Sequence, residues 1–528
     1  MSEEATAAQK PTRAARVDLN DAPVSRREIM IVYAGFMVIM GLAALDQSIV
    51  ATALPRIVSD LGGVTRLSWI VTAYVLASTS VMPLYGKLSD QYGRKPMTYA
   101  AVLIFLAGSA LCGFAQSMNQ LILFRALQGI GAGGLVPLSQ IVVADLIPPR
   151  ERGRYQGTIG IVYAFASVAG PAIGGFITDA LSWHWIFFIN LPIGVVAIIM
   201  IGVSLKRPNR IMKRRIDYLG AILLAAATTC FLLAFTLGGS TFAWDSPEVL
   251  GLVAGAAILA GLFVLQETRA PEPIMPLVLF RNKVFVMGSM VLALTFMALQ
   301  GASVFFPLFF QVVLGIKASN SGLLTAPMLV GIVVSARANG RFVLITGHYK
   351  PIQIFGLALS VIAFASLVWG TASGQGIPLI EPALIAVGLG LGMINPNMTV
   401  AVQNAVEREH LGSATASSAF FRSLGAVVGV AASGAILSLR LKDLLAVTPL
   451  PDGLDPHDVL SGGIVQIKAL PPEAFNVVVA IYRQALAVSF STGIVAATLA
   501  LVVAIMIPEL PLQTKTASGI TTTRSFKR

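Results

Sequence analysis

The sequence has few of the residues that soluble proteins place on their surfaces and that enzymes use for catalysis. Of its 528 residues only 12% are charged, against about 25% in an average soluble domain. The two cysteines, Cys112 and Cys230, lie in apolar runs, which argues against a disulfide framework or a thiolate metal site. The four histidines are scattered, and the sequence has no H-E-x-x-H and no G-x-x-x-x-G-K-[ST] run. We therefore expect no enzyme, no metal site, no cofactor and no ATP-driven machinery.

Apolar runs dominate the chain, and hydrophobic residues make up 56% of it. Each run is close to the length of about 20 residues that a helix needs to cross a bilayer. We predict an all-α polytopic membrane protein with fourteen transmembrane helices, surrounded by membrane lipids. The predicted spans are 29–53, 68–86, 97–115, 120–145, 157–179, 185–205, 218–238, 248–266, 284–309, 320–341, 352–371, 379–401, 414–438 and 484–507.

The basic residues predict the orientation of these spans. The net charge of +12 could suggest a nucleic-acid partner, but the lysines and arginines lie mainly in short loops, so we expect none. With the N-terminus inside, most of them fall in inside loops and tails, most densely in 206–215. We predict a bacterial inner-membrane protein with both termini in the cytoplasm. Residues 1–28 are polar and predict a disordered tail rather than a signal peptide.

Glycines in the first half of the chain recur in the second half at a nearly constant offset. Gly86, Gly93, Gly157, Gly170 and Gly174 match Gly340, Gly347, Gly412, Gly425 and Gly429. Such a repeat predicts two related six-helix bundles with a central site. We assign the N-terminal bundle to 29–205, two inserted helices with basic linkers to 206–283, the C-terminal bundle to 284–507 with an outside loop at 439–483, and a cytoplasmic tail to 508–528.

A short charged loop joins the second and third spans. Gly86 and Gly93 allow close backbone approach, and Asp90 stands where Arg94 or Lys95 could pair with it. The run resembles the G-x-L-x-D-x-x-G-R-K loop of the major facilitator superfamily, and we predict that it is a cytoplasmic latch. In the second half of the chain Leu344 stands where Asp90 does in the first, so a latch role for that copy is doubtful.

Asp46 is the only acid well inside any predicted span. A carboxylate at that depth costs several kcal/mol unless it is paired, hydrated or protonated. The segment 45–55 resembles the L-D-x-T-I-V-x-x-A-L-P signature of drug:proton antiporters, with Ser48 in the hydroxyl position. The resemblance implies that Asp46 couples transport to protons, and the alternative is a structural ion pair with Arg125.

Arg125 and Gln128 lie in a run of the fourth span that resembles the R-x-x-Q-G motif of the same family. A buried guanidinium keeps its proton, so Arg125 can change the proton affinity of a nearby carboxylate or compete with its proton. We predict that Gln128 lines the cavity.

The fifth span contains Gly170, Pro171 and Gly174, which resemble the G-P-x-x-G-G motif of antiporters. A proline removes a backbone hydrogen bond and bends a helix, so we predict a hinge here, with ordinary small-residue packing as the alternative. Arg422, in the thirteenth span, takes the place of Ser167 in the repeat. It either lines the cavity and receives an anionic group, or it snorkels or pairs.

These motifs together resemble the fourteen-helix drug:proton antiporter branch over residues 29–440. The resemblance implies a proton-driven exporter of amphipathic drugs or toxic compounds that works by alternating access. One alternative is a dedicated exporter of a single metabolite or lipid, and a remote one is a membrane-embedded enzyme or receptor. The sequence leaves the substrate and the need for a periplasmic adaptor open.

Overall fold

The computed structural model describes residues 26–62, 66–204, 216–239, 241–317, 322–449, 467 and 470–512. The predicted tails 1–28 and 508–528 lie largely outside the described residues, and so do the basic linker 206–215 and much of the predicted outside loop 439–483. Within the described ranges, 14 helices are long and apolar enough to cross a membrane. The predicted number of spans is therefore confirmed.

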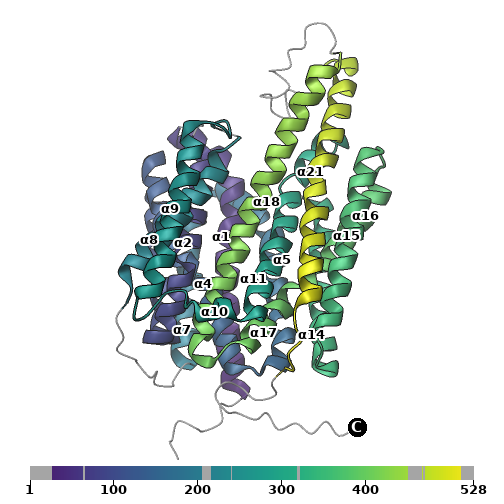
Figure 1. The fold of residues 1–528 in the computed structure, drawn as a ribbon. Helices are drawn as coiled ribbons and strands as arrows, with labels where there is room; N and C mark the ends of the chain where they lie inside the picture. The colour runs from purple at the N-terminus through teal and green to yellow at the C-terminus, as the bar shows by residue number, and fades with distance from the viewer. Residues whose placement is uncertain are drawn as a thin grey trace, which may run out of the picture.

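The helices form two bundles and an inserted pair (Figure 1). The first bundle has α1 (Arg26–Leu61), α2 (Leu67–Tyr92), α3 (Arg94–Gly113), α4 (Met118–Leu146), α5 (Pro149–Ala180), α6 (Trp185–Phe188) and α7 (Asn190–Ser204). The inserted pair is α8 (Tyr218–Leu237) and α9 (Pro247–Arg269). The second bundle has α10 (Val278–Arg281), α11 (Lys283–Ser303), α12 (Phe306–Leu308), the π-helix η3 (Phe309–Val313), α14 (Ala326–Thr346), α15 (Lys350–Ala372), α16 (Ile377–Gly392), α17 (Asn395–Ala405), α18 (Leu411–Val447) and α21 (Pro472–Met506).

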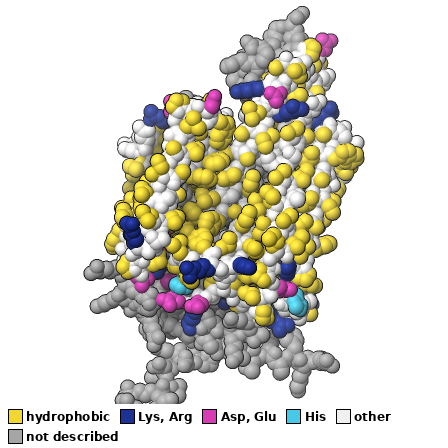
Figure 2. Space-filling view, viewed as in Figure 1, with side chains coloured by type: hydrophobic (Ala, Val, Ile, Leu, Met, Phe, Trp, Pro, Cys, Tyr) yellow, Lys and Arg dark blue, Asp and Glu magenta, His cyan; other side chains and the backbone are white. Residues whose placement is uncertain are grey.

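The sides of the molecule are apolar. In the view of Figure 2, hydrophobic side chains cover the flanks of both bundles, and charged side chains gather toward the two ends. Large apolar residues such as Phe165 and Phe176 are about 70% exposed. Because helices satisfy their own backbone hydrogen bonds, they can present such surfaces to lipid. The surface is that of a multi-pass membrane protein.

Two predicted boundaries were wrong. Helix α1 continues through Pro55 to Leu61, because buried Ile57 keeps the helix packed beyond the single hydrogen bond that a proline removes. The predicted span 284–309 lies within one membrane-crossing segment, Lys283–Val313, whose α-helix is interrupted after Ser303. The predicted outside loop 439–483 is largely helical at both ends, because Leu441 and Leu445 of α18 continue the apolar core that includes Val478 and Ile481 of α21.

The repeated glycines occupy matching places in the two halves. Gly170 and Gly174 bring α5 onto α1, where added Cβ atoms would meet Ser48 and Ile49. Gly425 and Gly429 bring α18 onto α11 in the same way, against backbone atoms of Ala293 and Met297. Small residues allow this close approach of membrane helices. The repeat read from the sequence therefore corresponds to equivalent helix contacts.

The two bundles touch at one end of the molecule, which is the end where α1 begins and where α14 ends. We call this the inner end, following the charge distribution of the sequence, and the opposite side the outer end. Helix α2 packs on α18, and α5 packs on α14. Gly86 lies directly against Gly412 and Ala416, and Gly153 lies against Gly340. Toward the outer end the two lobes separate around a hollowed apolar surface (Figure 2).

The inserted pair α8–α9 lies beside α2 on the flank of the first bundle (Figure 1). Its connection to the second bundle is fixed by Glu267, which accepts backbone hydrogen bonds from Ile274 and Met275. Lys87 of α2 makes a 2.7 Å ion pair with Glu272 of the same connection. These contacts hold the connection after the inserted pair against α2, close to the contact between the two bundles.

Candidate functional site

Asp46 lies in a closed polar cluster inside the first bundle. Its carboxylate accepts hydrogen bonds of 2.8 Å from Arg125 of α4, Gln128 of α4 and Asn190 at the start of α7. All four side chains are at most 1% exposed. We call these residues the carboxylate cluster. The carboxylate thus has one cationic and two neutral donors as partners within the bundle.

Arg125 has further partners besides Asp46. Its guanidinium donates to the side-chain oxygen of Gln128 at 2.7 Å and to the backbone oxygen of Ile70 at 3.3 Å. The ring of Tyr74 lies 4.1 Å below the guanidinium carbon. The positive charge of Arg125 is therefore stabilised by two oxygen acceptors and an aromatic ring in addition to Asp46.

The structure therefore brings Asp46 and Arg125 together, as the ion-pair interpretation predicted. It does not place Gln128 at a cavity surface, because Gln128 is fully buried against Asp46 and Arg125. The sequence reasoning missed Asn190. Its signal was a polar residue two positions before a proline inside an apolar run. Its contact with the carboxylate depends on how α7 packs against α1.

Gly170 and Gly174 form the contact surface of α5 toward α1. The hydroxyl of Ser48 also bonds the backbone oxygen of Ala166 at 2.8 Å, so the two helices are joined next to Asp46. Pro171 is exposed, and α5 continues through it to Ala180. The predicted hinge remains a prediction. Its glycines contact the part of α1 that carries Asp46, so a shift of α5 would move against that part of α1.

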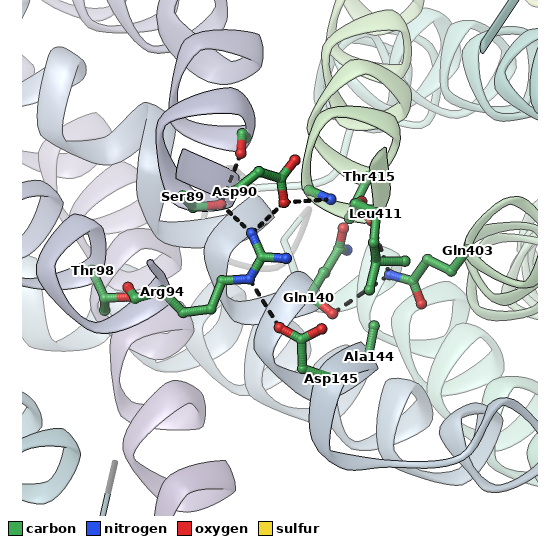
Figure 3. A network of polar contacts seen from close by, with 12 residues as sticks. Ser89, Asp90, Arg94, Thr98, Gln140, Ala144, Asp145, Gln403, Leu411 and Thr415 are labelled. Atoms are coloured by element: carbon green, nitrogen blue, oxygen red, sulfur yellow. Dashed lines mark hydrogen bonds and ion pairs between the residues drawn. The ribbon is translucent and has the colours of Figure 1, made fainter. Parts of the chain in front are cut away.

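The charged loop after α2 forms one of the contacts between the bundles at the inner end (Figure 3). Asp90 lies in the last turn of α2, and Gly93 makes the turn into α3 with φ of 95°, a value that favours glycine. The carboxylate of Asp90 accepts from the backbone N–H groups of Gly412 and Ser413 at 3.2 and 2.9 Å. A negative charge is favourable at a helix N-terminus, here that of α18.

Arg94 holds Asp90 in this position. It donates to Asp90 at 2.6 Å and to Asp145 of α4 at 2.9 Å. Lys95, the other predicted partner of Asp90, instead donates to the backbone oxygen of Gly202 on α7. Of the two basic residues, Arg94 therefore belongs to the contact that reaches the second bundle.

A second inner contact joins α5 to α14 and α17, and the sequence reasoning missed it. Arg150 donates to the backbone oxygens of Leu344 and Ile345, at the C-terminal end of α14. Arg152 caps the end of α4 through the oxygen of Ile147 and bonds Gln403 of α17 at 3.4 Å. In the second half of the chain, where Leu344 replaces the acid, the end of α14 is instead bound by the cation Arg150. A positive charge is favourable at a helix C-terminus. We call the α2–α18 and α5–α14 contacts together the inner gate.

Arg422 lies on α18, about three turns from its start. It is half-buried, its guanidinium carbon lies 5.0 Å from the centre of the Phe296 ring, and it donates a long hydrogen bond of 3.5 Å to the side-chain oxygen of Asn395. The structure therefore separates Arg422 from the carboxylate cluster.

Comparisons with known proteins give one family. A family model described as Major Facilitator Superfamily matches residues 36–430. "Multidrug transporter protein MdtP" of Bacillus subtilis is 39% identical over 428 residues, which cover 81% of this chain and 78% of that protein. "Multidrug resistance protein 3" of the same organism is 37% identical over 398 residues, covering 75% and 77%.

A solved structure supports the fold. The crystal structure of the human organic anion transporter MFSD10 matches with a TM-score of 0.62 and 14% identity, covering 91% of this chain and 100% of that one. At this identity the likeness concerns the fold alone.

Proposed function

Because the chain belongs to the major facilitator superfamily, whose members are transporters rather than enzymes, we propose that it exports amphipathic drugs or toxic compounds in exchange for protons. The relatives named as multidrug proteins support the export of varied compounds. The observation that carries proton coupling is the buried ion pair of Asp46 with Arg125. The proposal places both termini in the cytoplasm and the inner gate at the cytoplasmic side.

The carboxylate cluster can hold Asp46 in either protonation state. In the charged state, three donors surround the carboxylate. In the neutral state its O–H needs an acceptor, and the side-chain oxygen of buried Asn190 has no partner of its own. Rotation of the Asn190 amide would bring that oxygen to Asp46, while Arg125 keeps Gln128, Ile70 and the Tyr74 ring.

Proton exchange at Asp46 would be linked to helix movement. Asp46 is 1% exposed, so a proton reaches it only when its surroundings open. Helix α5 contacts α1 next to Asp46 and also forms part of the inner gate. A proton entering from the outer side would favour release of the compound there, and its departure on the cytoplasmic side would restore the binding state.

The test is transport by purified protein in liposomes with an imposed pH gradient, using a panel of amphipathic dyes of different scaffolds. We expect gradient-driven transport by the wild type, loss of it in Asp46→Asn, and partial activity in Asp46→Glu. Asp60→Asn, on the outer part of the same helix, is the matched control and should transport normally. Undiminished proton-driven transport by Asp46→Asn would contradict the coupling role.

The same experiment separates the alternatives. A dedicated exporter of one metabolite would respond to one scaffold only, whereas a multidrug exporter would move several. Since no second protein is present in these liposomes, transport there also shows whether the chain works without a periplasmic adaptor.

A further inference from the structure

Arg422 has an environment that differs from that of the charged groups in the carboxylate cluster. Asp46 and Arg125 neutralise each other at 2.8 Å. None of the ion pairs among the described residues includes Arg422. Its contacts are an aromatic ring, Phe296, and one long hydrogen bond to the neutral side chain of Asn395.

This arrangement leaves a positive charge without a compensating negative one. A guanidinium does not lose its proton in a protein, so Arg422 cannot become neutral on burial. A charge within a membrane span is costly unless it is paired or faces water. Arg422 is half-buried, so the residue keeps part of its surface outside the protein core.

The surroundings of Arg422 have the features of a ligand site. Asn395 begins α17, directly after the interruption that ends α16 at Gly392, and interrupted membrane helices often line binding sites near the membrane centre. Tyr163 of α5 belongs to the other bundle, is 36% exposed and interacts electrostatically with Arg422. The site thus has residues from both bundles, as a transported ligand requires.

We propose that Arg422 binds the acidic head group of the transported compounds, and that these compounds are amphipathic organic anions with an aromatic or apolar body. The inference rests on the proposed export function and names its substrate class. The guanidinium supplies the charge, Asn395 and Tyr163 supply polar contacts, and Phe296 supplies an apolar face. A carboxylate or sulfonate fits this site, whereas a quaternary ammonium is repelled.

The test uses two probes with the same fluorophore and opposite charge. Dansyl-6-aminohexanoate carries a carboxylate, and dansylcadaverine carries an ammonium group on a chain of similar length. Binding is measured by fluorescence to purified protein in phosphatidylcholine nanodiscs, with empty nanodiscs as background. Charged hydrogen bonds are strong enough for us to expect the anion to bind about tenfold or more tightly than the cation.

The variants separate the charge of Arg422 from its packing. Arg422→Gln should weaken binding of the anion by about tenfold to a hundredfold and leave the cation unchanged or slightly tighter. Arg422→Lys should restore part of the anion affinity. Arg337→Gln, which removes an exposed arginine in another span, is the matched control and should preserve the wild-type preference.

The outcomes distinguish this inference from the proposed function. If the wild type moves the cation under a pH gradient but neither binds nor moves the anion, export stands and the anion site is wrong. If both probes bind but neither is driven by the gradient, the anion site stands and proton-coupled export fails. Equal affinity of wild type and Arg422→Gln for the anion, or binding of neither probe, overturns the inference. Competition by added phosphatidylglycerol, with no transport of the anionic probe, would identify a lipid site instead.

Discussion

Replacing Asp90 with asparagine should release the inner gate. The substitution keeps the size of the side chain and removes the charge that faces the N-terminus of α18. It also turns one acceptor into an N–H₂ group, which cannot accept from the N–H groups of Gly412 and Ser413. Arg94 keeps Asp145 as a partner at 2.9 Å, so the variant leaves no buried cation alone and should still fold.

The size of the effect follows from these contacts. A partly buried charge at a helix terminus is worth up to about 2 kcal/mol, and the loss of charge also weakens the two backbone hydrogen bonds. A total of about 2 kcal/mol corresponds to a shift of about thirtyfold in the ratio of gate-closed to gate-open molecules. Ser413→Ala removes only the 3.2 Å hydroxyl contact and leaves the charge of Asp90 and both backbone hydrogen bonds in place, so its shift should be smaller than that of Asp90→Asn.

The assay is a distance measurement by pulsed electron paramagnetic resonance. Spin labels at Ser59 of α1 and Leu439 of α18, both exposed and near the outer end, are placed in a background with Cys112 and Cys230 replaced by alanine. Opening of the inner gate brings the outer ends together, so the short-distance population should grow in Asp90→Asn. Turnover should fall while ligand affinity stays nearly unchanged. Lost ligand affinity with an unchanged distance distribution would refute the latch.

Two further substitutions test the helix contacts. Gly170→Leu should insert into the membrane but lose export, because the new side chain meets Ser48 of α1. Gly175→Leu, which places its side chain in open space, should stay active. Equal export by both variants in a vesicle transport assay would show that the α1–α5 contact is not needed. Arg150→Ala removes two hydrogen bonds to the end of α14 and should shift the same distance distribution toward the gate-open form. Arg341→Ala, which removes an exposed arginine at the same end, should not shift it. The same shift in both variants would mean that the net positive charge of this end, and not the hydrogen bonds of Arg150, stabilises the contact.

The sequence predicted the elements whose signals are local. Fourteen apolar runs predicted the spans, and the repeated glycines predicted two related bundles, in which these glycines make equivalent helix contacts. The ion pair of Asp46 with Arg125 was predictable because an acid inside a span needs a cation. The roles of Gln128 and Asn190 were not, since a polar side chain on a membrane helix can face a cavity or a neighbouring helix with the same sequence pattern.

The inner gate shows the same limit. The contact of Asp90 with Arg94 follows from their spacing, but its contact with Gly412 and Ser413 depends on how two distant helices meet. The loss of the acid at Leu344 suggested a missing second latch. Arg150 supplies that contact from another helix, which no local comparison of the two repeats could reveal.

Helix α18 has a mechanical consequence. Its 37 residues make a rod about 55 Å long, well beyond the roughly 30 Å of hydrocarbon in a bilayer. The inner end is bonded to Asp90, and the outer end, joined to α21, stands clear of the first bundle (Figure 1). A tilt of one degree at the gate therefore moves the far tip by about 1 Å. An antibody fragment that clamps this tip would control the opposite side of the membrane without entering the transport path.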